Sequence, residues 1–262
     1  MTAGDQRNGG TPRKVPGRED LKRPLPKRFY SRAQVVRQDG LHALALDGRL
    51  ARTPGKALLA VAPEPLAVAI AAEWAAQGDV IDPETMPLTR ITNTAIDGVT
   101  GIEADVAADI VAFAASDLVC YRAETPPELT RRQAAAWDPV LDWAARRLGA
   151  HFVLASGVMP VVQPADALER VASHIGAACA LELSALHVMT TLTGSALIAL
   201  AHADAALDVA DAWRRAHVDE DWQIERWGAD EEAAARREMR WRDMQAASCI
   251  AVQMRAHRGA GC

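Results

Sequence analysis

The stretch Asp39-Gly-Leu-His-Ala-Leu-Ala-Leu-Asp-Gly48 decides the fold of the first part of the chain. Asp-Gly pairs favour tight β-hairpin turns, because glycine tolerates the positive φ angle that such turns require. Two pairs separated by one strand length predict antiparallel strands over residues 29–38, 41–46 and 49–53. Pro54-Gly55 adds a turn before another expected strand over residues 56–62. The sequence therefore predicts a β-meander domain over residues 25–63.

The rest of the chain has the apolar spacing of helices. Ile102, Val106, Ile110 and Phe113 recur at intervals of three and four residues, which places them on one helix face. Single helices are also expected over residues 184–201 and 205–227, and a last helix after Asp230. Strands first and helices afterwards predict an α+β protein, with a small N-terminal antiparallel β domain followed by a larger, mostly helical C-terminal domain over residues 64–254.

Composition and the two ends narrow the function classes. Residues 1–24 are basic and rich in Gly and Pro, which predicts a disordered tail, and residues 255–262 are expected to fray. The net charge of the 262-residue chain is −5, which argues against a general nucleic-acid binder. No apolar run is long enough for a membrane span or a secretory signal. The four cysteines are widely separated, which favours a reducing compartment, the bacterial cytoplasm or, for a eukaryotic source, the mitochondrial matrix.

Motifs of catalysis and cofactor binding are missing from the sequence. There is no Walker-type phosphate loop, no Gly-x-Gly-x-x-Gly, no His-Glu-x-x-His and no Gly-x-Ser-x-Gly. We therefore expect no enzyme, no cofactor and no metal site. The alternative is a hydrolase-type enzyme that uses carboxylates such as Glu73 and Glu220, and it predicts a deep pocket containing them. A third hypothesis, an adaptor subunit of a stable complex, predicts a large apolar patch.

The segment His217-Val-Asp-Glu-Asp-Trp-Gln-Ile-Glu-Arg-Trp-Gly228 is the candidate functional stretch. Read as one helix with the preceding turn, it places Glu220 near the middle of a face that also carries Trp213, His217, Ile224 and Trp227. A carboxylate in an apolar stripe must pair with an arginine of its own chain, change its protonation state, or meet a ligand. Val218 and Trp222 lie on the opposite side, so apolar surface is expected on two faces.

Tryptophan is unusually frequent here. The seven tryptophans outnumber the three phenylalanines and two tyrosines together. Tryptophan is usually a core residue, but it is also a residue that anchors protein interfaces. Trp222, Trp227 and Trp241 cluster around Gly228 beside acidic and basic side chains, which indicates recognition of a partner.

Three stretches together resemble a known family. The first runs from Leu46 to Pro54, the second comprises residues 72–77, 81–89 and 93–97, and the third is Asp221-Trp-Gln-Ile-Glu-Arg-Trp-Gly228. In order and spacing the chain resembles the assembly chaperones of the F-type ATP synthase catalytic head, of the type that binds the α subunit. The resemblance covers about residues 27–251.

The resemblance implies a protein that holds a partner and does not catalyse a reaction. The implied partner is the unassembled α subunit, whose apolar surface is covered until the β subunit replaces the chaperone. In this family an acidic residue just before the Gln-Ile-x-x-Trp-Gly motif matters, which here is Asp219, Glu220 or Asp221, and the helix face favours Glu220. The expected partner-binding residues are Asp219, Glu220, Asp221, Trp222, Ile224 and Trp227, with the β-domain edge as a candidate second wall.

Overall fold

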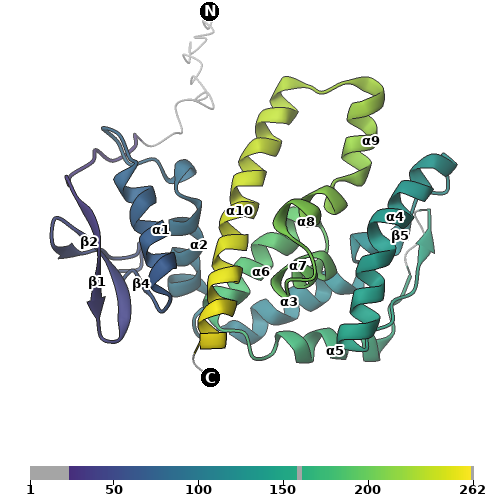
Figure 1. Cartoon of the computed structure of the whole chain (residues 1–262), viewed down its shortest axis with the longest axis horizontal. Helices are drawn as coiled ribbons and strands as arrows, with labels where there is room; N and C mark the ends of the chain where they lie inside the picture. Colours follow the sequence, from purple (N-terminus) through teal and green to yellow (C-terminus); the bar gives the residue numbers. More distant parts are fainter. Residues whose placement is uncertain (1–23, 158–160, 261–262) are drawn as a thin grey trace, which may run out of the picture.

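The computed structural model describes residues 24–157 and 161–260. Its strands are β1 (Ala33–Gln38), β2 (Leu41–Leu46), β3 (Arg49–Leu50), β4 (Ala60–Val61), β5 (Tyr121–Arg122) and β6 (Ala155–Ser156). Its α-helices are α1 (Glu64–Ala75), α2 (Pro87–Thr94), α3 (Glu103–Ala115), α4 (Pro127–Trp143), α5 (Ala165–Ile175), α6 (Ala180–Thr193), α7 (Ala196–Ala203), α8 (Val209–Ala216), α9 (Val218–Trp227) and α10 (Glu231–Ala260). The main sheet stands at one end and α10 runs through the middle of the helical part (Figure 1). The predicted α+β class is confirmed.

Strand β2 is the centre of the antiparallel sheet. β1 pairs with it along its whole length, and both β3 and β4 pair along its other edge. In each hairpin turn both residues have positive φ angles, 50° and 82° for Asp39 and Gly40, and 47° and 80° for Asp47 and Gly48. Both Asp-Gly turns are therefore confirmed, with the backbone that primed hairpin turns need.

The third and fourth strands are shorter than expected. The named strands end at Leu50 and resume at Ala60, and the segment between them is an irregular hairpin with an isolated bridge between Arg52 and Leu58. Asp97 accepts hydrogen bonds from the Thr53 hydroxyl at 2.6 Å and from the Gly55 amide at 2.7 Å. A Cβ atom at Gly55 would lie 2.6 Å from the Asp97 carboxylate, so glycine is required for this close approach. The loop between β3 and β4 is thereby bonded to the helical turn Ala95–Val99 that follows α2.

Helix α1 covers the main sheet, and the core continues beyond it. α1 contacts β1, β2 and β4 and presents Leu66 and Ile70, both fully buried. One cluster of buried apolar side chains extends from Tyr30 in the sheet region to Met254 in α10. The predicted domain boundary at residue 63 stays a prediction. Helix α1, which covers the sheet, follows that residue.

Glu73 of α1 fixes the start of α2. Its carboxylate oxygens accept hydrogen bonds from the backbone amides of Leu88 and Thr89 at 2.7 and 2.8 Å, and from the Thr89 hydroxyl at 2.8 Å. These amides belong to the first turn of α2, whose N–H groups have no partner within the helix. Burial raises the Glu73 pKa, and the Thr89 and Leu88 hydrogen bonds oppose that rise. Glu73 is a helix cap supplied from a neighbouring helix.

Replacing Glu73 with alanine is expected to lower the free energy of unfolding by about 1–3 kcal/mol, because buried N–H groups would lose their acceptor. Urea unfolding measures this directly. Glu84→Ala is the matched control, because Glu84 is an exposed side chain in the connector before α2. Equal unfolding midpoints for the two variants would contradict the capping role.

The helix expected over residues 184–201 is two helices, so that prediction was wrong. α6 ends at Thr193, Gly194 takes a left-handed conformation with φ of 66°, and Ser195 begins α7. The Ser195 hydroxyl accepts a hydrogen bond from the Ile198 amide at 3.0 Å. The Leu197 amide donates to the buried carboxylate of Asp117 at 3.0 Å. Gly194-Ser195 is therefore a helix stop followed by an N-cap, and not an interior pair.

The two tails predicted at the ends of the chain have different outcomes. Helix α10 continues to Ala260 and therefore includes residues 255–260, which were expected to fray, whereas residues 261 and 262 lie outside the described residues. The predicted disordered tail over residues 1–24 lies, apart from Pro24, outside the described residues. Within the described ranges no helix is long and apolar enough to cross a membrane.

Candidate partner-binding groove

The helix expected over residues 205–227 is broken at His217, so the single-helix prediction was wrong. α8 begins after Asp208, whose carboxylate accepts a hydrogen bond from the Asp211 amide, and ends at Ala216. His217 has φ of −111° and ψ of 23°, outside the helical region, and α9 begins after it. The sequence has no Gly or Pro at this break, and its apolar spacing continues across it. The pattern therefore predicted one helix where the structure has two.

His217 holds the break by contacts with α8. Its Nδ1 donates a hydrogen bond to the Trp213 carbonyl at 2.8 Å, and its ring lies 3.8 Å from the Trp213 ring, centroid to centroid. Burial lowers the pKa of His217, and the Trp213 hydrogen bond and the charge of Glu220 oppose that change. The imidazole is therefore neutral near pH 7, with its proton on the nitrogen that faces the backbone.

The three acidic candidates have different surroundings. Asp219 accepts a hydrogen bond from the Gln133 side chain at 2.8 Å, and Asp221 lies 2.6 Å from the Arg237 guanidinium. Glu220 makes no hydrogen bond to a described residue, and the basic side chain within 4 Å of its carboxylate is the neutral His217, at 3.8 Å. Its side chain is 35% exposed. Of the three carboxylates, Glu220 has the most freedom to accept a partner's donor.

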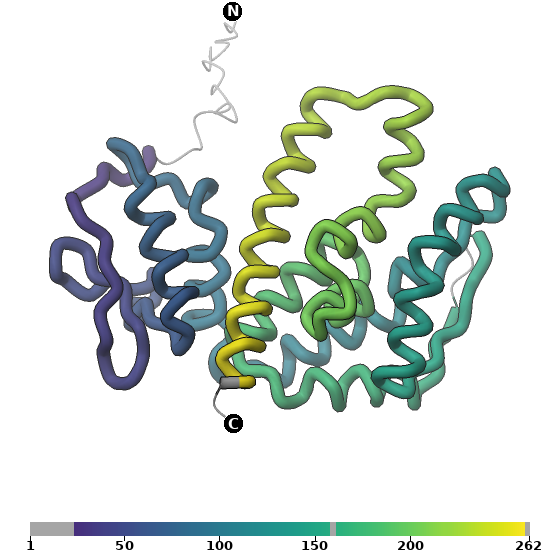
Figure 2. The backbone as a smooth tube through the Cα atoms, in the orientation of Figure 1, coloured from purple at the N-terminus to yellow at the C-terminus, as the bar shows by residue number. Residues whose placement is uncertain are grey.

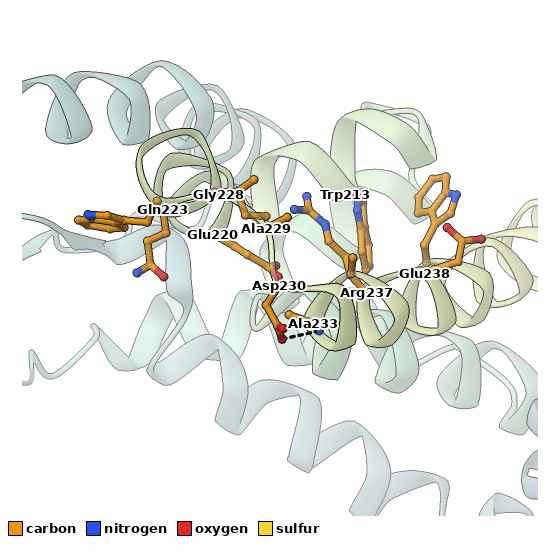
Figure 3. Close-up of a pocket in the computed structure, with 13 residues that line it drawn as sticks. Trp213, Glu220, Gln223, Gly228, Ala229, Asp230, Ala233, Arg237 and Glu238 are labelled. Atoms are coloured by element: carbon orange, nitrogen blue, oxygen red, sulfur yellow. Dashed lines mark hydrogen bonds between the residues drawn. The ribbon is translucent and has the colours of Figure 1, made fainter.

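Glu220 lines a groove between α9 and the first half of α10. Figure 2 shows these two segments standing above the rest of the helical part as an arch, joined by residues 228–230. The hollow between them has a volume of about 660 Å³, and we call it the arch groove. Figure 3 shows Trp213, Glu220 and Arg237 directed toward it. Its principal side chains are Trp213, Glu220, Ile224, Trp227, Arg237 and Trp241.

Comparisons with known proteins cover most of the chain. Residues 27–145 match the family model described as ATP12 chaperone protein. The crystal structure of a candidate chaperone from Agrobacterium tumefaciens is similar, with 45% identity, coverage of 90% of this chain and 88% of that one, and a TM-score of 0.85. Atp12 from Paracoccus denitrificans has 39% identity, coverage of 87% and 98%, and a TM-score of 0.81.

This chain belongs to the ATP12 chaperone family. A mutant of the Paracoccus protein, in which an aspartate is replaced by lysine, also matches, at 38% identity over 87% of this chain and 97% of that one, with a TM-score of 0.81. The family assignment makes the chain an ATP synthase assembly chaperone. The family model ends before α9, and the solved structures extend the likeness to nine-tenths of the chain.

The ATP12-type motifs of the first half hold the fold together. Asp97 and Thr53 come from two of the stretches that carry the resemblance, and they bond to each other. Gln77 accepts a hydrogen bond from the Asp82 amide at 2.7 Å and donates to the Thr85 hydroxyl at 3.0 Å, which fixes the connector before α2. These motifs therefore specify tertiary contacts, and only the third motif reaches the arch groove.

The six candidate residues do not all meet in the groove. Glu220, Ile224 and Trp227 line it, whereas Asp219 lines a neighbouring hollow. Asp221 does not line the groove and pairs with Arg237, which does. The second wall is α10 and not the β-domain edge, which contributes no lining residue to the arch groove. The sequence singled out Trp241 and placed Trp213 on the face of Glu220, but it gave no signal that placed Arg237 opposite α9.

Trp222 lies on the other side of α9. It is 4% exposed, and the guanidinium groups of Arg132 and Arg226 lie 4.7 and 4.0 Å from its ring centroid. Arg132 also pairs with Glu225 at 2.6 Å, which links α4 to α9. The placement favours a supporting role for Trp222, which holds α9 against α4, and its role in binding stays a prediction.

Trp222→Ala and Trp227→Ala form a matched pair with opposite expected results. Removing the buried Trp222 ring is expected to cost about 3 kcal/mol of stability, because large buried side chains leave cavities. Trp227 is 76% exposed, so its removal should change stability by no more than about 0.5 kcal/mol. Urea unfolding of both variants checks this. Equal losses of stability would show that the two faces of α9 are assigned wrongly.

The carboxylates of the enzyme hypothesis occupy separate places. Glu73 caps α2 and lines neither the arch groove nor the neighbouring hollow, whereas Glu220 lines both. Among the described residues no group of three or more His, Cys, Asp and Glu side chains is arranged to hold a metal ion. The arch groove combines aromatic and aliphatic surface with a few charged groups, which is the composition of a recognition site.

Proposed function

We propose that this protein binds the unassembled α subunit of the ATP synthase catalytic head and shields its apolar surface until the β subunit replaces it. The observation that carries the proposal is the arch groove, where Trp227 is 76% exposed beside Glu220, a carboxylate without a hydrogen bond to a described residue. An exposed tryptophan beside a free carboxylate is the composition of an interface anchor.

The groove suits temporary binding. Apolar contact with Ile224, Trp227 and Trp241 would supply affinity, and Glu220 would fix the register by pairing with a basic group of the α subunit. A groove that carries carboxylates beside aromatic rings can be exposed to water while the partner is absent. A permanent subunit interface is larger and more apolar. This composition favours a chaperone over an adaptor subunit of a stable complex. We propose the bacterial cytoplasm as its compartment (the mitochondrial matrix for a eukaryotic source).

Co-purification tests this function. The tagged full-length protein is expected to retain the α subunit of the same organism, and added β subunit is expected to release it. The β subunit alone serves as the control and should not be retained. Failure to retain the α subunit would contradict the proposed partner. A stable complex of all three proteins would contradict the replacement by the β subunit.

A further inference from the structure

A second hollow adjoins the arch groove at Glu220. It has a volume of about 560 Å³ and lies between α6, α8, the start of α9 and α10, and Glu220 is the residue that lines both hollows. Each hollow falls within the size of pockets that enclose ligands, about 300–1,000 Å³. Glu220 therefore stands at the junction of two neighbouring depressions and is not at the bottom of one.

The charges around the junction favour a cation. The arch groove is lined by the carboxylates of Glu220, Asp230 and Glu238. Its guanidinium, that of Arg237, is paired with Asp221 at 2.6 Å. In the second hollow, Arg240 donates a hydrogen bond to the Leu192 carbonyl and lies 5.9 Å from the Trp213 ring, so it is engaged within the chain. A basic side chain of a partner thus meets an excess of negative charge at Glu220.

Both hollows have mainly apolar walls, and they differ in the hydrogen-bonding groups that they add. Trp227, Ile224 and Trp241 give the arch groove aromatic and aliphatic walls. Thr191, Ser116 and Tyr121 give the second hollow hydroxyl groups. A chain segment that crosses both would place apolar side chains on each side of a central basic residue, and the second hollow adds hydroxyl groups that can bond to its backbone or polar side chains.

We infer that both hollows are occupied together by one continuous segment of the α subunit, which places a lysine or arginine at Glu220 with apolar residues toward α10. The inference rests on the proposed function and makes it specific, because it states the chemistry and the path of the bound segment. Charge complementarity supports this occupant, and binding of a second copy of this chain, whose residues 1–24 are also basic, is an outcome that the test distinguishes.

Photo-crosslinking of the complex between this protein and the α subunit tests the inference. p-Benzoylphenylalanine is introduced at Gln223, an exposed residue of the arch groove, and in a second variant at Thr191, an exposed residue of the second hollow. The control position is the exposed Glu169 on α5. Mass spectrometry of the crosslinked peptides locates the attachment points.

The expected result is that Gln223 and Thr191 crosslink to one stretch of the α subunit, with a lysine or arginine between the two attachment points, and that Glu169 does not. Reversing that basic residue to glutamate should abolish binding to the wild-type protein and restore binding to Glu220→Lys. Attachment points in unconnected segments, crosslinks to a second copy of this chain, or a complex without crosslinks from either position would overturn the inference while the proposed function stands. Absence of a complex would overturn the proposed function itself.

Discussion

Glu220→Lys is expected to weaken binding of the α subunit at least thirtyfold and to leave the fold intact. Breaking a hydrogen-bonded charge pair in an interface costs about 2–5 kcal/mol, and a lysine would also repel the partner's cation. The free protein should tolerate the change, because Glu220 is 35% exposed and makes no hydrogen bond to a described residue. Calorimetric titration with the α subunit measures the loss of affinity.

Two controls separate this effect from a general loss of negative charge. Glu169→Lys makes the same charge change at an exposed position of α5, outside both hollows, and should bind like the wild type. Glu220→Gln keeps the size of the side chain and should give an intermediate loss. Wild-type affinity in a folded Glu220→Lys protein would remove Glu220 from the binding site.

Asp117→Ala is expected to destabilise the protein by about 3 kcal/mol, because two buried amides would lose a charged acceptor. Asp117 is fully buried and accepts hydrogen bonds from the Val119 amide at 3.1 Å and the Leu197 amide at 3.0 Å. It thereby joins the turn before β5 to the start of the buried helix α7. Urea unfolding measures the loss, and Asp142→Ala, at an exposed position on α4, is the matched control.

The penalty of Asp117→Ala should depend on pH. Burial raises the Asp117 pKa to about 6, so the folded protein binds this proton at a higher pH than the unfolded chain. The stability contributed by this group therefore increases as pH falls through 6 and is lost as pH rises through it. The penalty at pH 5 should exceed that at pH 7 by about 1 kcal/mol. A penalty that shrinks on acidification would contradict the raised pKa.

The sequence predicted those features that depend on neighbouring residues. The Asp-Gly pairs set both hairpin turns, because positive φ at both turn positions is a local requirement that Asp and Gly satisfy. Proline is also a local signal, because its missing N–H group needs no partner in the first turn of a helix, and Pro65 stands in the first turn of α1. The order of strands and helices then gives the α+β class without any knowledge of distant contacts.

The sequence did not predict the helix and strand ends that depend on contacts between distant residues. The break at His217 depends on a hydrogen bond to Trp213 and on burial of the ring, and neither leaves a mark in apolar periodicity. The stop at Gly194-Ser195 is reinforced by Asp117, far away in sequence. The loop between β3 and β4 is held by hydrogen bonds to Asp97, far away in sequence. In each case a polar side chain from elsewhere in the chain holds a helix end or a loop in place.

The candidate site was found through α9 but not in full. Four residues that the apolar spacing placed on one helix face do line one groove: Trp213, Glu220, Ile224 and Trp227. This holds although the helix is broken between Trp213 and Glu220. The opposite wall comes from α10, and the packing of α9 against α4 by Trp222 decides which face remains free. That choice between the two apolar faces of α9 required the structure.

Hydrogen exchange of the amides of this protein, free and bound to the α subunit, tests the central claim most directly. The arch groove as binding surface predicts slower exchange in α9 and in the first half of α10, with little change in β1 and β2. Protection confined to the sheet, with exchange in α9 and α10 unaltered by the α subunit, would contradict it.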